Sequence, residues 1–162
     1  MSALSSEREG TAACSDGPSD SPAKLPFYTT AKAIPTARGA YLLVLELKRP
    51  LAIARPSVAM LPAGYYFYAG SACGQGGLKA RIGRHMRRPK RHYWHVDQIS
   101  AVAAVVGAFV WPGGNECALA ARWASIGTPV AGFGSSDCRR CRSHFLGPLA
   151  SLPHPPTLGD EA

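Results

Sequence analysis

The stretch FYAGSACGQGGLKARIGRH, residues 67–85, joins an aromatic segment to a basic one through a glycine-rich turn. The aromatic part is typical of a strand end, and residues 78–88 are typical of a helix that Pro89 stops. At about 100° per residue, Arg81 and His85 lie one turn apart, between the apolar stripe and the basic stripe of this helix. We therefore expect both side chains to point into a cleft beside the strand end.

The glycines of this stretch raise the question of a nucleotide-binding loop. A Walker-type loop needs GxxxxGK[ST], and a dinucleotide fingerprint needs GxGxxG within a βαβ unit. Gly70, Gly74, Gly76 and Gly77 match neither spacing. A turn that contains a left-handed glycine is the favoured interpretation.

Three apolar segments predict strands, and the first two are close enough in sequence to form an antiparallel hairpin. Asn115 has the residue type of an N-cap, and Glu116 follows in the first turn, where the helix dipole favours an anion. We predict an α+β fold, a small three-stranded antiparallel sheet flanked by helices. The predicted strands are residues 39–47, 65–69 and 103–111, and the predicted helices are 78–88, 92–100 and 117–126.

Composition divides the chain into three parts. Residues 1–35 are rich in Ser, Ala, Gly, Pro and Asp and predict a disordered leader, residues 36–150 the folded domain, and residues 151–162 a flexible tail. The start has no apolar signal-peptide segment, and the longest uncharged apolar run is too short to span a bilayer. We expect a soluble, cytoplasmic protein without a membrane partner.

Charge is concentrated in the folded part. Between residues 31 and 155 the chain has 16 of its 18 Lys and Arg residues but four acidic ones, a surplus of +12 against +8 for the whole chain. Such a surplus favours a polyanion, and we expect nucleic acid, DNA in preference to RNA. The expected contacts lie in one basic run, whose members other than Arg81 are Lys79, Arg84, Arg87, Arg88, Lys90 and Arg91.

The five cysteines form an odd count without a secretory signal, which argues against a disulfide framework. Cys138, Cys141 and His144 have C-x2-C-x2-H spacing, a zinc half-site whose fourth ligand would come from Cys117, Cys73 or His95. An arginine-rich loop that carries cysteines without metal is the favoured interpretation. His95 and Asp97 are expected to pair or hydrogen-bond near the cleft.

Read in order, the motifs G-x-Y (Gly39 to Tyr41), Y-x-G (Tyr68 to Gly70), L-x-x-R-x-x-x-H (Leu78 to His85) and a later Glu116 resemble the GIY-YIG nuclease superfamily. Further strings are similar to a poorly characterised GIY-YIG-like family, whose members occur alone or fused to endonuclease III-type DNA glycosylases. They include Tyr68-Ala-Gly-Ser-Ala, Trp94-His-Val-Asp97 and the segment from Gly132 to His144.

The resemblance implies a metal-dependent endonuclease that hydrolyses DNA phosphodiester bonds, with a place in DNA repair. It implies that Glu116 holds one Mg²⁺ or Mn²⁺, that Arg81 stabilises the phosphate, and that Tyr41 or Tyr68 relays the water's proton with help from His85. The nearby cations have the sign that lowers a tyrosine pKa.

The sequence is also compatible with two other functions. One is a DNA- or RNA-binding domain that keeps the fold and the basic helix without cutting, and the other is a zinc-stabilised interaction module. The chain also departs from the superfamily, which often carries a late Asn in the active-site region, and from the narrower family, which has a Cys-x-Cys spacing where this chain has one residue more.

Overall fold

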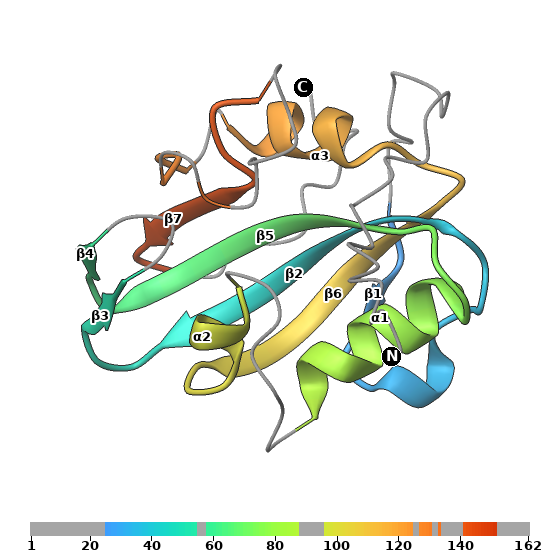
Figure 1. The fold of residues 1–162 in the computed structure, drawn as a ribbon, viewed down its shortest axis with the longest axis horizontal. Helices are drawn as coiled ribbons and strands as arrows, with labels where there is room; N and C mark the ends of the chain where they lie inside the picture. The colour runs from blue at the N-terminus through green and yellow to red at the C-terminus, as the bar shows by residue number, and fades with distance from the viewer. Residues whose placement is uncertain are drawn as a thin grey trace, which may run out of the picture.

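Strand β2 (Gly39–Leu47) is the central strand of a five-stranded antiparallel sheet in the computed structural model (Figure 1). The structure describes residues 25–54, 58–87, 96–124, 127–130, 133 and 141–151. The strand order is β1-β6-β2-β5-β7. The other four strands are β1 (Phe27–Tyr28), β5 (Gly64–Ala72), β6 (Ala104–Pro112) and β7 (Phe145–Leu149).

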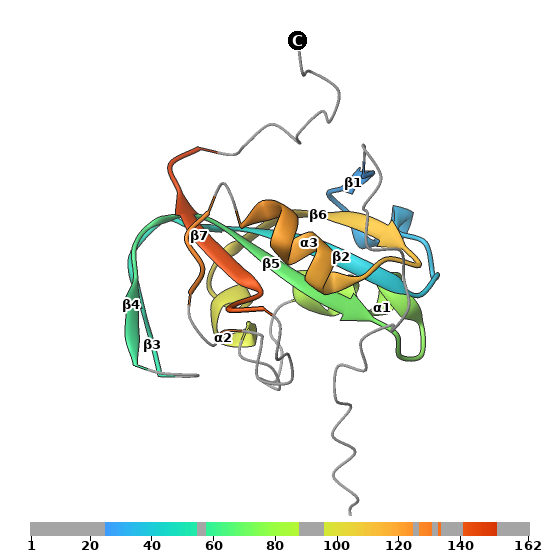
Figure 2. The same ribbon diagram turned by 90° about the horizontal axis from the view of Figure 1, so that it is seen from above.

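Strands β2 and β5 form the antiparallel hairpin that the sequence predicts, with Tyr41 opposite Gly70 and Leu43 opposite Tyr68. The chain between them forms a second, two-stranded sheet from β3 (Leu51–Ile53) and β4 (Ala59–Leu61). This small ribbon extends from the end of the hairpin, away from the start of β2 (Figures 1 and 2).

Helices cover both faces of the sheet (Figure 2). On one face α1 (Gly77–Met86) and α2 (Asp97–Ser100) cover an apolar core that includes Leu43, Leu78 and Ile82, and the short 3₁₀ helix η1 (Ala31–Ala33) packs against α1. On the other face α3 (Glu116–Trp123) covers a second core that includes Leu42 and Leu119. Because both faces are covered, every residue of β2 except Glu46 is buried.

The prediction of a three-stranded sheet is wrong, although the α+β class and the three central strands agree with the structure. The missed strands are the two edges. β7 contains Gly147 and Pro148, two residue types that are rare in strands. Pro cannot donate a ladder hydrogen bond, and an edge strand tolerates it because one side of that strand has no partner. β1 has only two residues, and it lies with η1 inside the segment predicted to be a disordered leader.

The helix predictions agree in position and differ at the ends. α1 ends at Met86, and α2 and α3 are shorter than predicted, while residues 88–95 and 125–126 lie outside the described part of the chain. Asn115 is the N-cap of α3, as predicted, and its Oδ1 accepts hydrogen bonds from the backbone N–H groups of Cys117 (2.8 Å) and Ala118 (3.3 Å). Among the described residues, no helix is long and apolar enough to cross a membrane.

Candidate active site

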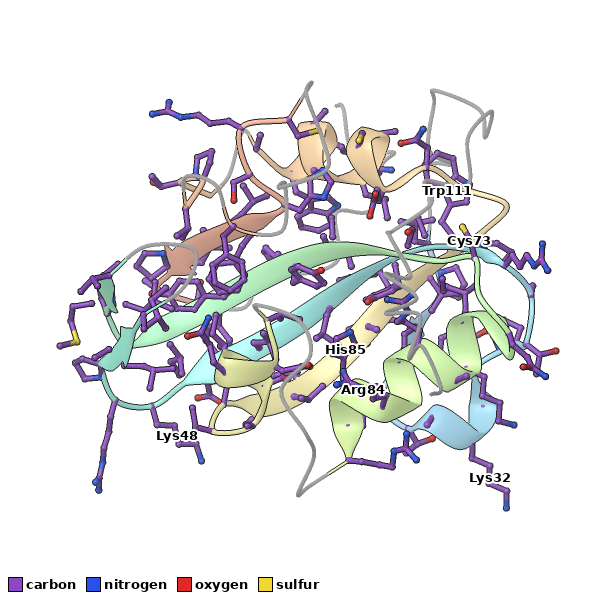
Figure 3. All side chains as sticks on the ribbon, in the orientation of Figure 1. Lys32, Lys48, Cys73, Arg84, His85 and Trp111 are labelled. Carbon is purple, nitrogen blue, oxygen red and sulfur yellow. The ribbon has the colours of Figure 1, made fainter. Side chains whose placement is uncertain are left out.

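Two tyrosines and a histidine meet between α1 and the sheet, and we call Tyr41, Tyr68 and His85 the tyrosine–histidine cluster. The hydroxyl of Tyr41 and Nε2 of His85 lie 2.8 Å apart in a buried hydrogen bond. The Tyr68 ring lies 6.4 Å from the Tyr41 ring and 6.1 Å from the His85 ring, centroid to centroid. His85 belongs to α1, which it joins to the strands beneath (Figure 3). The structure thus brings together three residues that the sequence predicts for one site.

Gly70 makes room for this arrangement. Tyr41 and Gly70 are partners across the β2–β5 hairpin, and a Cβ built on Gly70 would lie 2.5 Å from both Cζ and the hydroxyl oxygen of Tyr41. Such a distance is a severe clash with a ring that is itself buried. The glycine of the Y-x-G motif is therefore needed to leave space for the Tyr41 ring. The sequence alone does not reveal this contact.

Arg81 and Glu116 lie close enough to this cluster to affect its titration. Burial raises the pKa of Tyr41 well above 10, Tyr68 raises it further, Arg81 lowers it, and Glu116 raises it. Burial likewise raises the pKa of Tyr68, where Glu116 adds to the rise and Arg81 opposes it. Both phenols are therefore protonated at neutral pH. Four of the five residues predicted as catalytic therefore share one electrostatic environment, and the fifth, His85, is hydrogen-bonded to Tyr41.

Arg84 and Asp97 form a partly buried ion pair beside the cluster. Nη1 and Nη2 of Arg84 each lie 2.8 Å from one oxygen of the Asp97 carboxylate, whose side chain is fully buried. This bidentate geometry ties α1 to α2. Arg84, predicted as a phosphate contact, is thus held by protein. His95, the partner that the sequence predicts for Asp97, lies outside the described residues.

The N-terminus of α1 is closed to an anion by the protein's own backbone. The N–H groups of Leu78 and Lys79 donate to the carbonyl oxygens of Ala37 (2.9 Å) and Pro35 (3.1 Å). Gly76 and Gly77 have positive φ angles of 83° and 58°, as expected for a turn with left-handed glycines. The backbone donors that a phosphate would need at this helix start are therefore already used.

Three soft-metal ligands gather at the start of α3 and of β7, and we call Cys117, Cys141 and His144 the thiol–histidine cluster. One ligand atom from each lies within 4.8 Å of the other two, and Cys117 Sγ is 3.7 Å from His144 Nε2. Cys117 and Cys141 are not in disulfides. Of the three residues predicted as alternatives for the fourth ligand, the structure places Cys117 beside Cys141 and His144. Another alternative, His95, and the predicted ligand Cys138 lie outside the described residues.

Cys73 is in a disulfide, contrary to the expectation that the chain lacks such bonds. A disulfide-bonded sulfur has no thiolate to offer a metal, so Cys73 is removed as a ligand of the thiol–histidine cluster. An odd number of cysteines excludes complete pairing but does not exclude a single disulfide.

The predicted nucleic-acid contacts are only partly described. Lys79 is exposed on α1 and Arg87 is exposed directly after it. The ammonium of Lys79 donates to the carbonyl of Lys32 at 3.3 Å. Arg81 is half-buried at the margin of the tyrosine–histidine cluster. Arg88, Lys90 and Arg91 lie outside the described residues.

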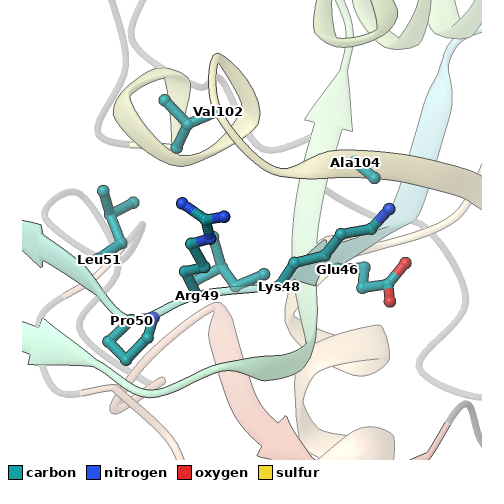
Figure 4. A pocket seen from close by; sticks show the side chains of 8 residues that line it. Glu46, Lys48, Arg49, Pro50, Leu51, Val102 and Ala104 are labelled. Carbon is teal, nitrogen blue, oxygen red and sulfur yellow. The ribbon is translucent and has the colours of Figure 1, made fainter.

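An open pocket of about 420 Å³ lies at the other end of β2, away from Tyr41 (Figure 4). Residues 46–51 line it together with Val102 and Ala104. Lys48 and Arg49 are exposed, and Glu46 is half-buried. Because none of the predicted site residues lines it, we place the candidate site at the tyrosine–histidine cluster, where the ionisable groups converge.

The fold and this cluster define a small α+β domain with a phenol–imidazole centre. The chain matches the family described as a domain of unknown function, DUF123, over residues 40–152, and it belongs to that family. The match covers the central hairpin except for Gly39, both clusters and β7. No curated protein and no solved structure matches the chain.

Proposed function

We propose that this chain is a metal-dependent endonuclease that cuts DNA at the tyrosine–histidine cluster. The hydrogen bond of 2.8 Å between the Tyr41 hydroxyl and His85 Nε2 carries the proposal. It supplies an acceptor for the proton of the attacking water, and Arg81 and Glu116 lie close enough to influence the same phenol. The resemblance of the motifs to GIY-YIG nucleases supports the same function.

The raised pKa of Tyr41 determines how the proton moves. A phenolate base would require the pKa to fall from about 10 to about 7, which is roughly 4 kcal/mol, and burial acts in the opposite direction. A concerted relay avoids this cost. The water gives a proton to the Tyr41 oxygen while the Tyr41 proton passes to His85 Nε2, so that Tyr41 stays neutral and His85 becomes the imidazolium.

The rest of the reaction is the displacement at phosphorus. The water oxygen forms a bond to phosphorus, and the bond from phosphorus to the leaving oxygen breaks. The guanidinium of Arg81 balances the charge that develops on the non-bridging oxygens. Solvent protonates the leaving oxygen, and His85 later returns its proton to solvent.

The donor set suits a single hard cation. In the described part of the chain the acidic residues are Glu46, Asp97 and Glu116. Asp97 is engaged by Arg84, and Glu46 lies at the distant pocket, so Glu116 is the carboxylate near the phenols. One carboxylate fits a Mg²⁺ or Mn²⁺ that keeps most of its waters, and this ion would neutralise phosphate charge.

Cleavage assays test the proposal. Purified full-length protein with Mg²⁺ or Mn²⁺ is incubated with labelled single-stranded, duplex and flapped DNA, beside Glu116→Gln and Arg81→Ala. We expect wild-type cleavage and a loss of at least about 100-fold in each variant. Glu46→Gln is the matched control, because it makes the same change at the far end of β2, and it should cut like wild type.

The non-catalytic alternative has its own outcome. If wild type binds the DNA but cuts none of these substrates, the chain is a binding domain and the nuclease proposal is rejected. Equal cleavage by Glu116→Gln and Glu46→Gln would also reject the role assigned to Glu116.

A further inference from the structure

We propose that Cys117, Cys141 and His144 bind a zinc ion. The distances carry this inference. A tetrahedral zinc with sulfur at about 2.3 Å and nitrogen at about 2.0 Å holds its ligand atoms about 3.5–3.8 Å apart. Cys117 Sγ and His144 Nε2 are 3.7 Å apart, and all three ligand atoms lie within 4.8 Å of one another. Movement of about 1 Å by the side chain of a cysteine completes the geometry.

The backbone holds two of these ligands, Cys117 and His144, independently of any metal. Asn115 caps the helix turn that carries Cys117. The carbonyl of His144 accepts the Ala69 N–H of β5 at 2.8 Å, and the His144 N–H donates to Phe133 at 3.0 Å. His144 is therefore fixed against the edge of the sheet, and its side chain is 2% exposed. A site whose ligands are already positioned loses little entropy when the metal binds.

The ligand types select the metal. Thiolate and imidazole favour a borderline-soft ion such as Zn²⁺, and they discriminate against Mg²⁺, which prefers oxygen. Two thiols and one imidazole leave one position of a tetrahedral shell that these three residues do not fill. The site is therefore chemically distinct from the one that Glu116 would provide for Mg²⁺ or Mn²⁺.

Glu116 also lies behind the histidine. Nδ1 of His144 is 3.9 Å from Oε2 of Glu116, on the side of the ring away from Cys117. Histidines that bind zinc through one nitrogen usually direct the other N–H towards a carboxylate, which fixes the tautomer and the orientation of the ring. This arrangement is the second observation that points to a metal at Nε2, and it links the thiol–histidine cluster to Glu116.

Metal analysis tests the zinc site without any DNA, so its failure is distinguishable from failure of the nuclease proposal. Full-length protein without an affinity tag is loaded with zinc, dialysed and analysed for metal content. We expect one zinc per chain. Cys117→Ser, Cys141→Ser and His144→Gln should each bind zinc at least about 100-fold more weakly, because loss of a ligand exceeds the usual effect of a second-shell change. Cys14→Ser, which removes a cysteine outside the described residues, should retain one zinc.

Two further measurements keep the test decisive if a variant fails to fold. Wild-type protein loaded with Co²⁺ should show sulfur-to-cobalt charge transfer and the intense visible bands of tetrahedral cobalt, and a zinc chelator should lower its Tm. Glu116→Gln should keep its zinc with affinity about 10-fold weaker. Wild type with well below one zinc per chain, or a Cys117–Cys141 disulfide in the native protein by mass spectrometry, would overturn the proposal.

Discussion

Two almost fully buried histidines, His85 and His144, lie in opposite chemical surroundings. His85 is 2.8 Å from a phenol beneath α1, and His144 is 3.7 Å from a thiol at the start of α3. The first neighbour exchanges protons, and the second binds soft metals as a thiolate. The chemistry available to a buried imidazole therefore depends on the atom that faces its Nε2, a phenol oxygen for His85 and a thiol sulfur for His144.

The largest effect is expected for Tyr41→Phe, which should change the function of the tyrosine–histidine cluster and leave the thiol–histidine cluster intact. Tyr41→Phe removes the hydroxyl that binds His85 and should lower the rate of DNA cleavage by at least about 100-fold, since it removes the relay. Zinc content should stay at the wild-type value. Single-turnover cleavage and metal analysis on the same preparation measure both.

Tyr68→Phe is the matched control for this prediction. Its ring lies 6.1 Å from that of His85, so the same chemical change should reduce cleavage less than Tyr41→Phe does. A greater loss in Tyr68→Phe would contradict the relay through Tyr41 and would assign the proton transfer to the other phenol.

The next effect concerns the space that holds Tyr41. Gly70→Ala places a methyl group 2.5 Å from the Tyr41 phenol, and overpacking of this kind should lower the free energy of unfolding by about 2 kcal/mol. Gly83→Ala is the control, because its Cβ would meet Ala31 Cβ at 3.5 Å, an ordinary contact. Alanine at this helical position should leave stability unchanged or raise it by up to about 1 kcal/mol. Urea unfolding of both variants checks the difference, and equal stabilities would show that the Tyr41 ring moves without cost.

Alkaline pH should weaken the fold through the buried tyrosines. Burial raises the pKa of Tyr66 to about 12, and those of Tyr41 and Tyr68 are also raised. Below pH 10 the phenols are protonated in both states, so their contribution to stability is complete. Above pH 10 the unfolded state ionises first, and this contribution is lost as pH rises through the folded-state pKa values.

Urea unfolding at pH 9, 10 and 11 measures this loss. Tyr66→Phe should make the decline with pH shallower, because one of the titrating groups is gone. A decline of the same steepness in wild type and in Tyr66→Phe would mean that Tyr66 titrates normally in the folded state.

The smallest expected effect concerns the basic surface of α1. Lys79→Ala should weaken DNA binding a few-fold for every sequence and reduce the slope of log K against log salt by about one unit, since one phosphate contact is lost. Lys48→Ala is the control, because this exposed lysine lies at the pocket beyond the end of β2 and not on α1. Equal slopes for the two variants would remove α1 from the DNA-binding surface.

Much of the fold could be predicted because its signals are local. The hairpin β2–β5, strand β6 and the cap of α3 each depend on residues close in sequence. The edge strands could not be predicted in this way. β7 contains Gly147-Pro148, and β1 is two residues long, so both depend on the neighbouring strands β5 and β6 for their hydrogen bonds.

The candidate site likewise has one part that local sequence signals predict and one part that only the structure shows. The spacing of Arg81 and His85 and the Y-x-G motif predicted which residues would lie near one another, because a helix and a strand have fixed periods. The sequence predicts Arg84 as a phosphate contact, and the structure adds that its guanidinium pairs with Asp97 from α2. No local signal reveals that pair, since its members lie 13 residues apart on separate helices.

Residue order therefore determined the elements of this domain, its basic charge and the residue types available for chemistry, because these depend on side-chain periodicity and composition. Tertiary structure decided which of those side chains meet. The missing side chain of Gly70 leaves space for the Tyr41 ring across the hairpin. Cys117 lies beside Cys141 and His144, although the two cysteines are 24 positions apart in the sequence. Such contacts arise when helices pack on both faces of a sheet, and packing brings together atoms whose separation along the chain carries no information about their distance in space.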